Sequence, residues 1–206
     1  MKTRTISLLV AAAGLVVLAG CFGSTAPARF YALTSMEQSA AGPGPKSGLS
    51  GISVGIGPVK IADYLDRSDI VTRDTGNTVK FAEFHQWAGS LEDSFTSALA
   101  ENLGFLLRSE QIYVRPWPQA VPVKYQLALE LIRFDGKLGG EARLIARWSV
   151  SGEETGKPLA VKRSSIQEPT GGSGYEDLVA AESRAVAKLS REIAEIIITQ
   201  EKDQDR

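Results

Sequence analysis

The sequence predicts a single α/β or α+β domain in which a mixed, mainly antiparallel sheet has two long helices packed on it. Residues 87–107 and 178–196 place an apolar side chain at every third or fourth position, which is typical of amphipathic helices. Residues 123–134 and 141–150 instead alternate apolar and polar side chains, as half-buried strands do. The turn at residues 135–140 joins them into a long antiparallel hairpin.

The chain begins with the features of an export signal. Lys2 and Arg4 precede an apolar stretch, residues 6–18, that has signal-peptide length and is too short to span a bilayer comfortably. The sequence Leu18-Ala19-Gly20-Cys21 then resembles the bacterial lipobox, in which the cysteine is acylated and becomes the new amino terminus. We therefore expect a signal peptide at residues 1–20 and lipidation of Cys21. An ordinary signal peptide or a transmembrane anchor that happens to contain a cysteine is the alternative.

The composition of the mature chain restricts its partners. Lys2 and Arg4 lie in the signal, so 21 basic and 24 acidic residues remain, a net charge of about −3. This net negative charge excludes nucleic acid as a partner, because nucleic-acid binding needs a basic protein surface. Cys21 is the only cysteine, so the chain forms no intramolecular disulfide. Phe22 directly follows the cysteine. An aspartate at this position often signals retention of a lipoprotein at the inner membrane, so its absence favours the outer membrane.

The remaining elements follow in order along the chain. Residues 21–28 predict a lipidated tether, residues 29–200 the domain, and residues 201–206 a polar tail. Short strands are expected at residues 30–33, 52–61, 112–114 and 157–167, and a hairpin at residues 70–73 and 78–81. Residues 39–51 predict a loop, and residues 62–67 a turn or short helix. The first long helix is expected to begin with Trp87, and Ser173 with Glu176 has the spacing of a capping box before the second.

Several stretches together resemble the ABC-type transport auxiliary lipoproteins, a PqiC/YmbA-like family. Their order and spacing behind a lipobox carry the resemblance, which covers nearly the whole mature chain. The stretches are Phe30-Tyr31-Ala32-Leu33, residues 54–59, Tyr64-Leu65-Asp66-Arg67, residues 70–73, residues 82–88, Glu101-Asn102-Leu103, Pro116-Trp117, Phe134-Asp135-Gly136 and Ala146-Arg147-Trp148.

The resemblance implies a non-catalytic lipoprotein that works beside an MCE-domain protein in moving lipid between the inner and outer membranes. It implies a lipid-anchored position on the periplasmic face of the outer membrane, through acyl chains on Cys21. Whether the partner system contains an ABC transporter or a paraquat-inducible-type membrane protein stays open. A homo-oligomer that matches a ring of MCE proteins is a further alternative.

The residues themselves favour no enzyme, metal or cofactor. His85 is the only histidine, and Cys21 is expected to be acylated, so the usual ligands of a metal site are missing. A Ser-His-Asp triad would need His85, yet no Gly-x-Ser-x-Gly motif is present. His85 is therefore interpreted as a surface or helix-entry residue.

The candidate partner-binding residues are Tyr64, Leu65, Arg67 and Trp87. Tyrosine and arginine are favoured anchors of protein interfaces, which makes this segment a candidate docking loop. The alternative is structural, with Tyr64 and Leu65 closing the end of the core and Arg67 pairing locally. For the whole protein the alternatives are a periplasmic carrier that encloses an acyl chain in a roomy core, and a structural outer-membrane assembly factor.

Overall fold

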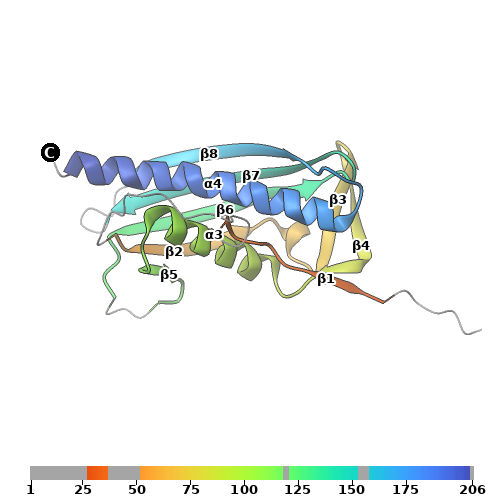
Figure 1. Cartoon of the computed structure of the whole chain (residues 1–206), viewed down its shortest axis with the longest axis horizontal. Helices are drawn as coiled ribbons and strands as arrows, with labels where there is room; N and C mark the ends of the chain where they lie inside the picture. Colours follow the sequence, from red (N-terminus) through yellow and green to blue (C-terminus); the bar gives the residue numbers. More distant parts are fainter. Residues whose placement is uncertain (1–26, 37–51, 118–120, 153–157, 205–206) are drawn as a thin grey trace, which may run out of the picture.

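The computed structural model describes residues 27–36, 52–117, 121–152 and 158–204. The predicted signal, Cys21 and the loop at residues 39–51 lie outside these ranges. One mixed sheet of eight strands and two long helices make up a single domain, which confirms the predicted fold class (Figure 1). The strands are β1 (Arg29–Tyr31), β2 (Val54–Ile61), β3 (Asp69–Thr75), β4 (Thr78–Trp87), β5 (Ile112–Val114), β6 (Tyr125–Gly136), β7 (Glu141–Gly152) and β8 (Pro158–Pro169).

Long antiparallel ladders and short parallel ones build the sheet. β6 pairs with β7 and β7 with β8 along nearly their full length, as the alternation predicts. β3 and β4 form the predicted hairpin around Gly76 and Asn77. The parallel pairs join strands that are distant in the sequence: β1 with β4, β3 with β6, and β2 with both β5 and β6.

Both helices, α3 (Leu91–Leu107) and α4 (Tyr175–Gln204), lie on one face of the sheet (Figure 1). Large side chains fill the layer between helices and sheet, among them Trp148, Phe95 and Phe134, all almost fully buried. Gly136 sits where α4 comes close to the sheet, since a Cβ there would lie 2.6 Å from Leu178 Cδ1. The same Cβ would lie 2.7 Å from the Glu141 carbonyl oxygen and 2.8 Å from Ala142 Cα, so a larger residue at this position would also displace the backbone of β7.

The first helix starts later than the apolar spacing predicts. Ser90 caps it, because the Ser90 side chain accepts a hydrogen bond from the Asp93 backbone N–H at 2.9 Å. The predicted start at Trp87 is wrong, since Trp87 is the last residue of β4. The strand happens to end on an apolar residue four positions before Leu91, so the helical period continues across the boundary.

The second helix begins at Tyr175, two residues after the predicted cap Ser173. Gly174 precedes its first turn, and the Asp177 carboxylate accepts a hydrogen bond from the Gly174 N–H at 2.9 Å. Asp177 therefore takes the role predicted for Glu176. The predicted buried stripe is confirmed at Leu178, Ala185, Leu189 and Ile193, and the stripe continues through Ile197 in place of Ile196.

The last turns of α4 run through residue 204, past the residue 200 at which the domain was expected to end. Glu201 is buried there, and its carboxylate lies 2.7 Å from Lys124 Nζ at the start of the hairpin. Lys124 thus faces the helix and not the open side of the sheet. Within the described ranges, neither helix has a run of apolar residues sufficient to cross a bilayer.

After β1 the chain runs between the two helices. We call residues 33–36 the strap. Its backbone N–H groups donate to side chains from both helices: Leu33 N to Ser94 Oγ, Thr34 N to Ser183 Oγ and Met36 N to Asn102 Oδ1, at 2.6 to 3.1 Å. The strap is therefore joined to α3 and α4 by polar side chains that no local sequence pattern connects.

Candidate functional site

A short 3₁₀ turn after β2, η2 (Asp63–Leu65), contains the candidate docking residues Tyr64 and Leu65, and Arg67 follows it by two residues. Its backbone is fixed at both ends, since Ala62 N–H donates to the Leu131 carbonyl at 3.0 Å and Arg67 N–H to the Leu65 carbonyl at 2.8 Å. Leu65 is 1% exposed and anchors the turn in the core. The turn is thus a defined part of the fold and presents its neighbours in fixed positions.

Tyr64 is half-buried and fixed through its hydroxyl group. The Tyr64 hydroxyl donates to Asp135 Oδ2 at 3.1 Å. Burial, with the nearby Asp135 carboxylate, raises the pKa of Tyr64 to about 12. The hydroxyl therefore stays protonated and acts as a donor throughout the physiological range.

Asp135 is the centre of this network and is fully buried. Arg73 donates to its Oδ2 atom from Nε at 3.1 Å and from Nη2 at 2.9 Å, and Arg133 donates to Oδ1 from Nε at 2.8 Å. One carboxylate thus accepts hydrogen bonds from two arginines and a tyrosine. The hydrogen bond to Asp135 raises the pKa of Arg73. Such charge-assisted bonds hold β3, β6 and η2 together at one end of the sheet.

Arg67 lies over an exposed aromatic ring. Its guanidinium carbon is 3.6 Å from the centroid of Phe81, and its Nε donates to the Tyr64 carbonyl at 3.0 Å. Phe81 is 44% exposed, a large fraction for a phenylalanine. Tyr64, Arg67 and Phe81 therefore make a small aromatic and cationic surface, which we call the η2 surface.

Trp87 lies beneath this surface. It is 4% exposed, and its ring packs at 6.4 Å from that of Phe134. Its backbone N–H donates to the carbonyl of Ser68, the residue after Arg67, at 2.7 Å. Of the four predicted residues, Tyr64 and Arg67 reach the surface, while Leu65 and Trp87 support them from the core.

Three residues of this site, Arg73, Phe81 and Asp135, were not predicted as functional. The sequence placed Asp135 in the turn at residues 135–140, but β6 continues through Gly136. A register shift between Leu131 and Arg133 interrupts the alternation, so that Phe134, Asp135 and Gly136 are all buried. Two signals were available: an acid directly after an apolar strand, and the presence of Arg73 and Asp135 in stretches that resemble the family.

His85 belongs to a separate aromatic cluster on β4. Its ring stacks on Tyr175 at 3.9 Å between centroids, and its Nδ1 lies 2.8 Å from the Tyr31 hydroxyl. Burial and the neighbouring Arg29 lower the pKa of His85, so the imidazole is neutral at pH 7. In the described part of the chain no three His, Cys, Asp or Glu side chains lie close enough to hold a metal ion. His85 is not at a helix entry; it joins β1, β4 and the first turn of α4.

We therefore predict that His85→Ala lowers the free energy of unfolding by about 1–2 kcal/mol, through loss of one stacking contact and one hydrogen bond. Urea denaturation measures this, and His85→Gln should recover part of it. Partner binding should be unchanged in both folded variants. Loss of partner binding in both, with zinc found by elemental analysis of the wild type, would contradict the interpretation.

Residues 31–194, from the end of β1 through the first two thirds of α4, match the family described as the ABC-type transport auxiliary lipoprotein component. The chain belongs to this family. The match includes η2, Phe81 and Asp135, so the whole network above lies in the family domain. No curated protein sequence matches the chain.

Solved structures share the fold of this transport auxiliary lipoprotein. A crystal structure of an uncharacterised protein has a TM-score of 0.68 at 19% identity, over 84% of this chain and 99% of that one. A crystal structure of a Xanthomonas campestris protein has a TM-score of 0.69 at 16% identity, over 86% of this chain and 99% of that one. At these identities the similarity describes the fold alone.

Proposed function

We propose that this transport auxiliary lipoprotein is a non-catalytic adaptor, anchored by acyl chains on Cys21 to the periplasmic face of the outer membrane. Its η2 surface docks an MCE-domain protein of an intermembrane lipid transport system. The acyl chains hold the protein near the transport system, which raises the effective concentration of the η2 surface at its partner. A weak contact at η2 is then sufficient for docking.

The η2 surface is the observation that supports docking. An exposed phenylalanine with an arginine stacked on it offers the side-chain types that dominate interface energies. Because Asp135 fixes Tyr64 and Leu65 anchors the turn, little conformational entropy is lost when a partner binds. Leu65 and Trp87 contribute in this proposal by holding Tyr64 and Arg67 in place.

The packing of the interior favours the adaptor over the carrier. A carrier would enclose an acyl chain between sheet and helices, where Trp148, Phe95 and Phe134 are packed. Self-association stays an alternative for the open sheet face, where Arg147 Nη1 lies 2.8 Å from Glu130 Oε2. That pair is exposed and well hydrated, so it contributes little to stability and is available for another contact.

The test measures affinity for the purified MCE-domain protein of the same organism, with unacylated Cys21→Ala protein in solution. We expect Arg67→Ala and Tyr64→Ala each to weaken binding by about 1–2 kcal/mol, as interface anchors do. Tyr64→Phe keeps the ring and loses the bond to Asp135. It should therefore lower the free energy of unfolding by about 1 kcal/mol and leave the affinity nearly unchanged.

Arg163→Ala is the matched control, since Arg163 is an exposed arginine on β8. It should change neither affinity nor stability. If folded Tyr64, Leu65 and Arg67 variants bind as tightly as the wild type, the docking proposal fails and the segment is structural. The anchor is checked separately by intact mass: membrane-extracted protein should lack residues 1–20 and carry acyl mass on Cys21.

A further inference from the structure

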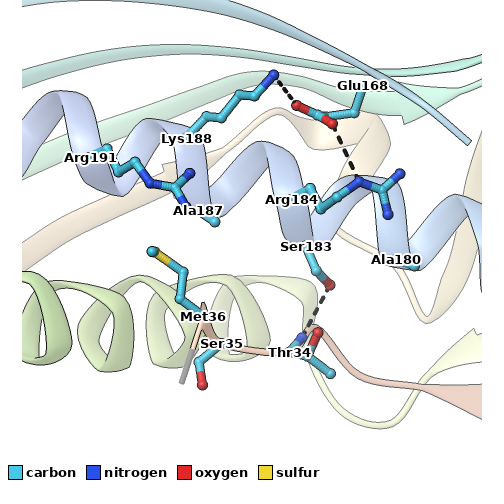
Figure 2. Close-up of a pocket in the computed structure, with 10 residues that line it drawn as sticks. All are labelled: Thr34, Ser35, Met36, Glu168, Ala180, Ser183, Arg184, Ala187, Lys188 and Arg191. Carbon is cyan, nitrogen blue, oxygen red and sulfur yellow. Dashed lines mark hydrogen bonds and ion pairs between the residues drawn. The ribbon is translucent and has the colours of Figure 1, made fainter. Parts of the chain in front are cut away.

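A groove runs along the outer side of α4, beside β1 and the strap. It consists of two adjoining hollows of about 620 and 450 Å³, which share Thr34, Ala180 and Ser183. The first hollow begins at Arg29 and Phe30, and the second ends at Arg191. Figure 2 shows the second hollow, with the strap on one side of α4 and Glu168 of β8 on the other. The groove thus connects the first residues of the domain with the middle of α4.

The charges along this groove are mainly positive. Four cations line it, against the two acids Glu168 and Glu176; the cations are Arg29, Arg184, Lys188 and Arg191. Lys188 and Arg184 both reach Glu168, whereas Arg191 lies along α4 away from it (Figure 2). Arg29 and Arg191 make no ion pair within the described residues. The groove is therefore a local basic area on a mature chain whose net charge is about −3.

An exposed phenylalanine marks the end of the groove nearest the anchor. Phe30 is 64% exposed although it lies in strand β1. Only seven residues separate Arg29 from Cys21, and such a segment spans at most ~25 Å when extended. An aromatic ring and an arginine at this distance from acyl chains are well placed for the headgroup region of a bilayer.

We infer that this groove face, from Arg29 and Phe30 along α4 to Arg191, docks on a bilayer surface that carries anionic headgroups. The inference rests on the proposed anchor at Cys21, because the anchor brings the groove to the membrane. Phe30 enters the interface and the cations attract the headgroup phosphates, so the domain lies against the membrane in one orientation. Several acyl chains on one residue already give stable attachment, so the groove face sets the orientation of the domain on the bilayer and not its anchoring.

The test uses the unacylated mature chain with Cys21→Ala, so that its result depends neither on lipidation nor on a transport partner. Co-sedimentation measures its partition onto vesicles of phosphatidylcholine alone, or with 30 mol% phosphatidylglycerol. We expect stronger binding to the anionic vesicles, and 0.5 M NaCl should remove the difference. A protein of net negative charge without a local basic area would be repelled.

Two pairs of matched variants locate the surface. Arg29→Gln with Arg191→Gln should lower partition onto anionic vesicles roughly 25-fold, since each cation near such a surface contributes a factor of about five. Lys162→Gln with Arg163→Gln on β8 removes the same charge and should have little effect. Phe30→Ser should weaken binding to both kinds of vesicle, whereas Val161→Ser, also at a residue 64% exposed, should not.

Absence of any preference for anionic vesicles, or an equal loss in the β8 control, would overturn the inference. So would binding to dispersed short-chain phosphatidylglycerol as tight as to vesicles, which would make the groove a site for a single lipid. The affinity for the MCE-domain protein, measured on the same variants without lipid, separates the two proposals. Loss of vesicle binding with intact partner affinity, in the Arg29 and Arg191 variant, supports two distinct surfaces.

Discussion

Asp135→Asn should lower the free energy of unfolding by about 3–5 kcal/mol, the usual cost of removing one partner from a buried ion pair. The amide keeps the shape of the side chain but loses its charge. Arg73 and Arg133 would then remain largely buried, with side chains only 16% and 25% exposed, without a carboxylate to compensate them. This loss is a large fraction of the 5–15 kcal/mol that stabilises a typical domain.

Urea denaturation at pH 7 measures the effect of Asp135→Asn. Asp74→Asn is the matched control, because Asp74 pairs with Lys80 at the exposed end of the β3–β4 hairpin, whose Arg73 bonds Asp135. That variant should unfold at nearly the wild-type denaturant concentration. A loss below 1 kcal/mol in Asp135→Asn would mean that water or movement of the arginines replaces the carboxylate, and the network would then not hold η2 in place.

Glu182→Gln should make the protein more stable at neutral pH and change how stability depends on pH. Glu182 lies in α4 and is 1% exposed, and neither carboxyl oxygen has a hydrogen-bond partner in the described structure. Burial, with a smaller contribution from the Asp135 charge, raises the pKa of Glu182 well above its usual 4.5. The side chain is therefore neutral in the folded protein at pH values where it ionises in the unfolded chain.

The direction of the pH effect follows from this difference. Below pH 4.5 both states are protonated, and Glu182 has no effect on pH dependence. As the pH rises above 4.5, only the unfolded state ionises, so the free energy of unfolding falls by up to about 1.4 kcal/mol per pH unit until the folded-state pKa is reached. Glutamine does not titrate. Between pH 4.5 and the folded-state pKa of Glu182, the free energy of unfolding of Glu182→Gln should therefore rise relative to that of the wild type.

The measurement is urea unfolding of both proteins from pH 4 to pH 8. The stability difference should be small at pH 4 and grow steadily towards neutral pH. Glu195→Gln changes an exposed glutamate of the same helix, and its stability difference from the wild type should not change with pH. An equally flat profile for Glu182→Gln would show that water or a local opening of α4 solvates the carboxylate.

The sequence predicted the parts of the fold that depend on local periodicity. The stripe from Leu91 to Leu107 and the alternation in β6 and β7 each report which face of an element is buried, and both are confirmed. Boundaries were less predictable. Trp87 continued the helical spacing although it ends a strand, and only the Ser90 cap distinguishes the two elements.

The site depended on contacts that local patterns do not report. Asp135 meets Tyr64 and Arg73, which lie 71 and 62 residues away in the sequence. Its burial follows from the irregular register of β6, and the sequence contains no signal for that shift. Tyr64 and Arg67 could be chosen by residue type, whereas Phe81 could not, because its exposure depends on how β4 lies against η2.

The strap determines how the domain would respond to mechanical force. A pull on the chain ahead of β1 loads the three-residue ladder between β1 and β4 first, and then the hydrogen bonds of the strap to Ser94, Ser183 and Asn102. These bonds connect to both helices, and α4 in turn packs along β7 and β8. The strap therefore passes tension on to both helices and through α4 to the sheet, so the resistance of the domain does not depend on the short ladder between β1 and β4 alone. In the proposed role between a membrane and a transport partner, this arrangement would keep the domain folded under tension.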